Sequence, residues 1–244
     1  MMRSWQAVIA VIAVSGGLVL FGVPSETWAT TATLSLACGV SALALMAAAA
    51  ILAARWPAFE GLFGGLDRVY DAHKWLGVFA LSLASVHLLF KAGDPLWQAE
   101  AIVGLPPEVA RFVRQASFVA LMAIVILALN RNIPYNVWRW WHRLSGPLFL
   151  VVIAHWLSIK SPIGLVSPAG VWLVSLSALA VIAAAYKLLL YPVVARHGHY
   201  RIVNVSRGAA AAEIELEPVS HRARFHAGHF GFLRMRPDRL REPH

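Results

Sequence analysis

Long apolar runs, separated by short polar stretches, occupy most of this chain. A helix needs about 20 consecutive apolar residues to cross the hydrocarbon core of a bilayer. Six runs are long enough, namely residues 5–24, 33–54, 71–92, 112–130, 138–160 and 169–192. The pattern therefore predicts an all-α membrane protein, a bundle of six transmembrane helices. Arg3 precedes the first run as in a signal peptide, but the run is long for that role, so we interpret it as a retained span.

The pattern changes after Pro192, where continuous apolar runs give way to alternation. Residues 200–205 and 212–217 alternate apolar and polar positions, as half-buried strands do, and an apolar stretch follows at 230–233, so we expect two or three strands. We therefore expect a helical membrane domain over residues 1–195 and a short C-terminal β segment over 196–244. Fewer than about fifty residues do not easily build a stable barrel. We interpret the segment as the incomplete start of a β-barrel domain.

Composition supports the membrane class and excludes several chemistries. Of 244 residues, 59% are hydrophobic and only 14% are charged, which is unusual for a soluble domain. Cys38 is the only cysteine, so intramolecular disulfides, cysteine zinc sites and iron–sulfur clusters are excluded. The net charge of +9 is spread over loops and the tail. We therefore expect a lipid bilayer rather than a nucleic acid as the partner.

The distribution of lysine and arginine predicts the orientation. With the N-terminus inside, one face carries nine basic residues: Arg3, Arg55, Arg68, Lys74, Arg131, Arg139, Arg143, Lys187 and Arg196. The opposite face carries four: Lys91, Arg111, Arg114 and Lys160. Cytoplasmic loops are enriched in these residues. We expect a multi-pass protein of the plasma (inner) membrane with both termini in the cytoplasm.

Four of the ten histidines lie inside predicted spans, and only two spans contain them. His73 and His87 are 14 residues apart (87 − 73) in the third span, and His142 and His155 are 13 apart (155 − 142) in the fifth. Ionisable groups inside a bilayer are costly and usually functional. The third and fifth spans cross in the same direction, so depth pairs His73 with His142 and His87 with His155.

This pattern favours two haems. The two levels are roughly 20 Å apart at about 1.5 Å per residue, which leaves room for two porphyrins. Neutral imidazole suits iron, and two axial imidazoles give a six-coordinate haem suited to electron transfer. Haem propionates favour nearby cations. The candidates are Arg68, Lys74, Arg139 and Arg143 at the cytoplasmic level, and Lys91 and Lys160 at the other.

Helical phase raises one difficulty for the fifth span. Fourteen residues return to within about 40° of the starting face, whereas thirteen leave His142 and His155 roughly 140° apart on an ideal helix. Pro147 lies between them in Ser145-Gly146-Pro147. A proline inside a helix bends or breaks it. We therefore predict a kink that re-aims one ligand. The alternative interpretation of any single histidine here is an interhelical hydrogen-bonding residue.

Two sequence motifs around the histidines resemble those of a known family. Leu66-Asp67-Arg68-x4-His73-Lys74 with His87 following, and Trp141-His142-Arg143-Leu144 with His155, resemble the ferric reductase-like transmembrane family, which includes NADPH oxidases and metalloreductases. Phe225–Leu233 is similar to the strand that lines FAD in that family, and Glu242-Pro243-His244 resembles the lead-in to its flavin motif.

The resemblance implies an oxidoreductase with a transmembrane electron path. Electrons would pass from cytoplasmic NAD(P)H to FAD, then to an inner and an outer haem b, and then to an extracytoplasmic acceptor such as ferric iron or oxygen. His73 and His142 would ligate the inner haem, and His87 and His155 the outer one. His244 would contact the flavin.

Two features depart from the family pattern. The sequence ends at the first residue of the flavin motif, so we expect an incomplete FAD site, supplemented by a flavin domain or a separate flavoprotein. Oxygen-reducing members place an arginine and an extra histidine near the outer haem, whereas Lys91 stands four residues after His87 here. Two alternatives stay open: a haem subunit between a flavoprotein and a periplasmic reductase, and a haem-free transporter or scaffold.

Overall fold

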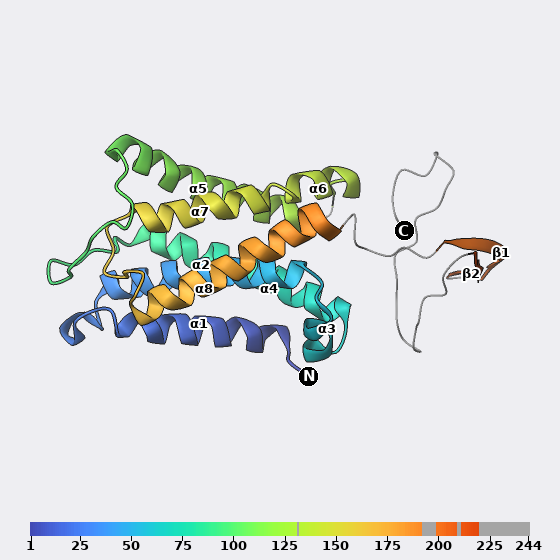
Figure 1. Cartoon of the computed structure of the whole chain (residues 1–244), viewed down its shortest axis with the longest axis horizontal. Helices are drawn as coiled ribbons and strands as arrows, with labels where there is room; N and C mark the ends of the chain where they lie inside the picture. The colour runs from blue at the N-terminus through green and yellow to red at the C-terminus, as the bar shows by residue number, and fades with distance from the viewer. Residues whose placement is uncertain (131, 192–198, 209–210, 220–244) are drawn as a thin grey trace. The chain divides into compact units, whose positions relative to one another are not determined.

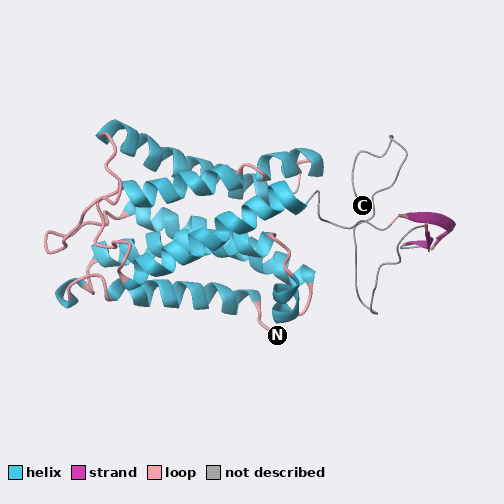
Figure 2. Ribbon diagram, viewed as in Figure 1, coloured by secondary structure: helices cyan, strands magenta, loops and turns pink. Residues whose placement is uncertain are grey.

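The computed structural model describes residues 1–130, 132–191, 199–208 and 211–219. The chain forms two compact units, a helical bundle within Met1–Leu189 and a second unit, Leu190–His244, that contains a two-stranded sheet (Figures 1 and 2). The longer helices are α1 (Ser4–Leu20), α2 (Thr31–Ala53), α4 (Leu66–Leu89), α5 (Pro107–Leu129), α7 (Ser145–Ser158) and α8 (Pro168–Ala185). The shorter ones are η1 (Ser25–Thr27), α3 (Pro57–Phe63), α6 (Tyr135–His142) and the π-helical η2 (Tyr186–Leu190).

Four helices of the described chain are long and apolar enough to cross a membrane: Thr31–Ala53, Leu66–Leu89, Pro107–Leu129 and Pro168–Leu190. The expected count of six spans is not confirmed. α1 has only 17 residues, at the lower limit of a spanning helix. The fifth expected span, 138–160, is divided into α6 and α7, and α7 has 14 residues.

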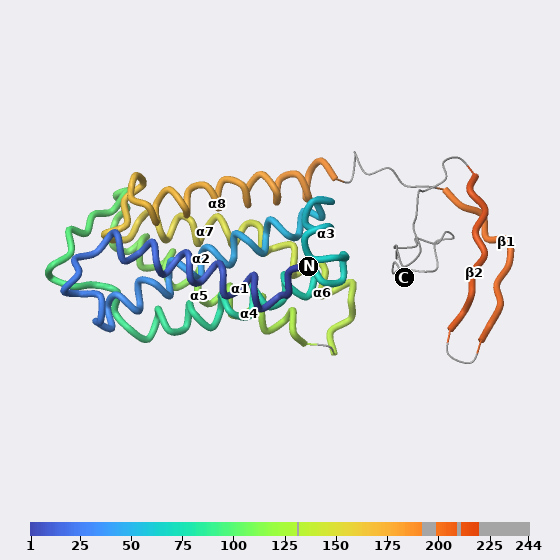
Figure 3. Tube along the Cα trace, turned by 90° about the horizontal axis from the view of Figure 1, so that it is seen from below, coloured from blue at the N-terminus to red at the C-terminus, as the bar shows by residue number. Residues whose placement is uncertain are grey.

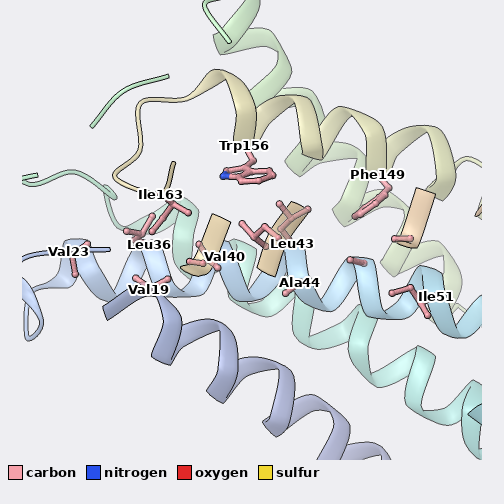
Figure 4. Packing of buried hydrophobic residues seen from close by; sticks show 14 of the residues in the cluster. Val19, Val23, Leu36, Val40, Leu43, Ala44, Ile51, Phe149, Trp156 and Ile163 are labelled. Atoms are coloured by element: carbon pink, nitrogen blue, oxygen red, sulfur yellow. The ribbon is translucent and has the colours of Figure 1, made fainter. Parts of the chain in front are cut away.

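Helix α2 forms the centre of the bundle and packs against α1, α4, α7 and α8. Its sequence is rich in alanine, serine and glycine, and small side chains let neighbouring helices approach closely. Figure 4 shows Phe149 and Trp156 pointing from α7 toward α2, where Val40 and Leu43 are also buried. Because neighbouring helices cover both faces of α2, its backbone is held in place and can position side chains of the helices around it.

The outer surface of the bundle is apolar. Phe112 and Ile126 of α5 and Ile182 of α8 are exposed by 70%, 55% and 60%. Exposed apolar surface on this scale is unfavourable in water but suits hydrocarbon. The exposed faces of α5 and α8 are therefore suited to contact lipid.

The two ends of the bundle differ. The N-terminus, α3 and α6 lie at one end (Figure 1), and the left-handed Gly64 (φ 87°) terminates α3 there. At the other end the backbones of Glu100 and Ser161 exchange hydrogen bonds of 3.3 and 3.2 Å, and the Val103 N–H donates to the Leu157 carbonyl at 2.8 Å. These bonds tie the α4–α5 connection to the α7–α8 connection.

The described part of the second unit contains two strands. β1 (Tyr200–Arg207) pairs antiparallel with β2 (Ala212–Pro218), with a bulge between Ile202 and Asn204. The strands expected over 200–205 and 212–217 are confirmed. The strand expected over 230–233 lies outside the described residues, and the boundary expected at 195/196 stays a prediction.

Candidate functional site

The first pair of predicted ligands lies side by side. The ring centroids of His73, on α4, and His142, the last residue of α6, are 5.8 Å apart, with the rings at 77° to each other. The ring of Trp138 also stacks on the ring of His142, with centroids 5.1 Å apart and planes at 10°. The structure thus brings together the two residues that depth alone had paired.

The ring of His73 is oriented by the backbone of α2. Its Nδ1–H donates to the carbonyl oxygen of Ala49 at 2.8 Å. A carbonyl can only accept, so Nδ1 must carry the proton and the Nε2 lone pair is left for a ligand. In metal sites the second ring nitrogen of a histidine ligand is held in this way, which fixes its tautomer and orientation.

The second pair lines one cavity. His87 of α4 and His155 of α7 both line a space of about 820 Å³ between α2, α4, α5 and α7, together with Lys91 and Arg114. Cofactor sites have volumes of about 300–1,000 Å³. The cavity is therefore of a size that can hold a large planar cofactor beside both rings.

The ring of His87 is oriented as His73 is. Its Nδ1–H donates to the carbonyl oxygen of Ser35 at 2.9 Å. The Ser35 hydroxyl lies 3.2 Å from the same nitrogen and donates to the carbonyl oxygen of Phe90 at 2.7 Å, where α4 ends. Ser35 therefore holds both the ring and the end of the helix that carries it.

The two carbonyls share the spacing of the two histidines. Ser35 and Ala49 are 14 residues apart (49 − 35), as are His73 and His87 (87 − 73). Fourteen residues return to nearly the same face of a helix, within about 40°. Because α2 and α4 run antiparallel, one face of α2 presents a carbonyl to each histidine. The α2–α4 contact thus sets both levels of the site.

The absence of a side chain at Gly39 leaves room for the ring of His87. A Cβ at this position would lie 2.8 Å from Nδ1, 3.0 Å from Cε1 and 3.1 Å from Cγ of His87. Real Cβ atoms essentially never come within 3.0 Å of a heavy atom. Only glycine lets α2 approach this face of the imidazole so closely.

The rings contributed by the α6–α7 segment lack comparable support. In the described part of the chain, the buried Nδ1 atoms of His142 and His155 have no hydrogen-bond partner. A buried polar atom without a partner costs about 1–3 kcal/mol. Such a cost is expected where a side chain is kept for a ligand rather than for the fold.

The break expected in the fifth span is confirmed as a tight turn, in which the N–H groups of Arg143, Leu144 and Gly146 donate to the carbonyl three residues earlier instead of four. α6 ends at His142 and α7 begins at Ser145, with Arg143 and Leu144 in a turn. Pro147 explains the position, because a helical proline clashes with the carbonyl four residues earlier, which belongs to Arg143. The interruption places the ring of His142 beside His73 while His155 lines the cavity with His87.

Replacing Pro147 by alanine tests whether this proline causes the interruption between α6 and α7. The change permits a continuous α6–α7 helix, which would turn His142 about 140° away from the face of His155. We expect a partial loss of the cofactor held by His73 and His142, with the other level less affected. The visible spectrum of the purified protein measures it. Pro168→Ala is the matched control, because Pro168 is at the start of α8, where no helical N–H is needed. Equal spectra for both variants would contradict the role of Pro147.

The remaining expected site residues divide into three groups. Arg143 is exposed in the α6–α7 turn, and Lys74 forms a 3.1 Å ion pair with Asp71. Arg68 is five residues before His73, about 140° around α4, and lines a groove shared with α1. The structure therefore does not bring Arg68 to the histidine pair. His244 lies outside the described residues.

Sequence reasoning did not single out four residues of the site: Ser35, Gly39, Ala49 and Arg114. Ser35 and Ala49 act through backbone carbonyls, which every residue has, so no residue type could indicate them. Arg114 had been counted only among the basic residues that set the orientation.

The residues present fit haem. Within the described residues, no group of three or more histidine, cysteine, aspartate or glutamate side chains could hold a metal ion. A metal bound by two imidazoles must therefore bring its other ligands with it, as iron does in a porphyrin. With metal–nitrogen bonds of about 2 Å on each side, two axial imidazoles have centroids about 6 Å apart. The observed 5.8 Å for His73 and His142 agrees with this value.

Comparison with known protein families supports the resemblance of the helical bundle. Residues 38–153 match the family model described as "Ferric reductase like transmembrane component". The matched segment includes His73, His87 and His142 and ends two residues before His155 (155 − 153). A comparison with curated proteins found no match.

Proposed function

Because residues 38–153 match the model of the ferric reductase-like transmembrane family, we propose that this protein carries single electrons across a membrane through two b-type haems. The donor is a cytoplasmic flavin reduced by NAD(P)H, and the acceptor is extracytoplasmic, ferric iron or oxygen. The chain is then the electron-conducting part of an oxidoreductase. The observation that carries the proposal is the placement of imidazoles from α4 and from the α6–α7 segment at two levels: the ring centroids are 5.8 Å apart at one level, and both rings line one cavity at the other.

The chain's own residues set the properties of each level. Bound haem supplies an iron that changes its charge by one electron. His73 and His142 would hold the haem at one level, and His87 and His155 would hold it at the other, where the iron would accept and donate single electrons. The carbonyls of Ala49 and Ser35 fix the rings of His73 and His87, and such second contacts raise the basicity of the ligating nitrogen.

Cations at each level would hold the propionates. Lys91 and Arg114 line the cavity at the level of His87 and His155. Lys74 and Arg143, at the level of His73 and His142, are exposed. Charge-assisted hydrogen bonds from such groups to carboxylates are about twice as strong as neutral ones. These cations would also limit the cost of placing two propionates near a bilayer.

The proposal places all six expected segments across the membrane. The 17 residues of α1 can span about 25 Å, and α6 with α7 together continue the fifth crossing. Basic residues then collect on the side of the N-terminus, which we assign to the cytoplasm. The second unit would begin the flavin domain on that side, with His244 as a flavin contact.

Electron transfer across a sealed membrane tests the function. We expect liposomes that contain the haem-loaded protein and trapped ferricyanide to produce ferrocyanide when dithionite is added outside. His199→Ala, a substitution at an exposed residue of the second unit, is expected to keep the rate. His87→Ala is expected to abolish the rate while leaving one haem reducible. Haem-loaded protein that conducts no faster than empty liposomes would contradict the proposal.

A further inference from the structure

A second feature of the bundle lies away from the histidines, in a groove between α1 and α4. These helices lie side by side (Figure 3). The groove has a volume of about 700 Å³, and its walls include Arg3, Trp5 and Val8 of the N-terminal segment and Arg68, Trp75 and Phe79 of α4. We propose that it binds one anionic phospholipid of the surrounding bilayer. The proposal requires only that the bundle lies in a membrane and does not depend on haem.

Two arginines at the mouth of the groove are available to a phosphate. Among the described residues, neither Arg3 nor Arg68 forms an ion pair, and the Arg68 guanidinium contacts only the weak acceptor Sδ of Met1, at 3.3 Å. Asp71 also lines the groove. Its carboxylate is already occupied, because it accepts a 2.6 Å hydrogen bond from the Ser4 hydroxyl and pairs with Lys74 at 3.1 Å. The mouth therefore carries excess positive charge.

The groove becomes apolar with depth. Arg68, Trp75 and Phe79 share one face of α4, since steps of seven and eleven residues return within about 20° of the start. Trp5, Trp75 and Phe79 are exposed by 55%, 41% and 39%. From Arg68 to Phe79 the helix rises about 16 Å. The arginines lie at the end of the groove, the tryptophans come next, and Phe79 lies deeper. This order matches that of the phosphate, glycerol and acyl chain of a lipid.

The chemistry favours a lipid over a soluble anion. A free phosphate compound would use the arginines but leave the exposed aromatic walls uncovered, whereas an acyl chain covers them. Basic pockets between helices on the cytoplasmic side of a membrane bind anionic headgroups, with about 1 kcal/mol for each arginine or lysine near the surface. This value corresponds to about a fivefold change in affinity per arginine.

The test uses the full chain purified in detergent with equimolar phosphatidylglycerol and phosphatidylcholine. We expect the lipid that remains after gel filtration, counted by mass spectrometry, to be enriched in phosphatidylglycerol. Arg3→Gln with Arg68→Gln should lower the affinity about fivefold for each arginine and remove the enrichment. Arg201→Gln with Arg207→Gln changes the net charge equally, at exposed positions of β1, and should keep it.

Three outcomes would overturn the proposal. The first is retention of the two lipids in the mixing ratio by the unaltered protein. The second is equal retention by the groove variant and its control, with both showing unchanged circular dichroism. The third is displacement of phosphatidylglycerol by millimolar glycerol phosphate, because the headgroup alone would then account for binding. Phe79→Ala adds an independent measurement and is expected to weaken retention without altering the charge.

Discussion

Replacement of His142 by alanine is expected to remove about half of the haem from the purified protein. The reason is geometric, because the imidazole ring of His142 lies beside that of His73, with ring centroids 5.8 Å apart. In this variant, His73 would be left as the single protein ligand to a haem bound at that level. The absorbance of the reduced haem per mole of protein measures the loss. His73→Ala should give the same loss, and His87→Ala and His155→Ala should each remove the other half.

A structural role for His142 predicts a different result, and two variants separate the cases. His142→Met retains a possible iron ligand, and a methionine–histidine pair raises the reduction potential of a haem. We expect it to keep the haem with a higher potential at one level only. His199→Ala, which replaces an exposed histidine of the second unit, should leave the spectrum unchanged. Full haem content with unaltered potentials in all four histidine-to-alanine variants would end the ligand assignment.

The pairing of the histidines was predictable because it follows from two strong rules. Apolar run length sets where each span begins and ends, and helical rise then converts residue number into depth. His73 and His142 needed no more than these rules to be matched. The interruption between His142 and Ser145 was also foreseeable, since Pro147 removes a donor and clashes one turn earlier.

The number of spans and the position of Arg68 were harder to predict from the sequence. The expected span over 138–160 joined α6 and α7 into one stretch, although α6 contains Arg139 and His142 and is much less apolar than α7. Arg68 lies close to His73 in sequence but about 140° away around α4. Which face of α4 meets α2 depends on the packing of small residues in α2, and the hydropathy of α4 does not specify it.

Gly39 illustrates the other limit of sequence reasoning. In an apolar helix a glycine resembles a weak point, since glycine is destabilising there by about 0.5–1 kcal/mol relative to alanine. Nothing in the residues around Gly39 indicates that a ring from another helix lies against it. The reason for the glycine emerges only when α2 and α4 are placed together, with Nδ1 of His87 at 2.8 Å from the missing Cβ.

Gly39→Ala is therefore expected to displace the ring of His87 and to remove, or strongly weaken, the haem at that level. All three near atoms belong to the ring, so the ring as a whole must move. Movement would stretch its 2.9 Å hydrogen bond to the Ser35 carbonyl, which fixes the tautomer. The absorbance per mole of protein should fall by up to about half. A redox titration should show that the remaining haem keeps its potential.

Gly17→Ala separates this effect from helix propensity. Gly17 lies in α1, which carries none of the four histidines, and a Cβ there would meet nothing within 4 Å. Both substitutions replace a helical glycine by alanine, so each should stabilise its helix by about 0.5–1 kcal/mol. Only Gly39→Ala also introduces a contact with a ligand ring. Loss of haem in Gly39→Ala alone would locate the effect at the α2–α4 contact. Equal haem content and equal potentials in the two variants would mean that α2 does not constrain His87, and the role assigned to Ser35 would fail with it.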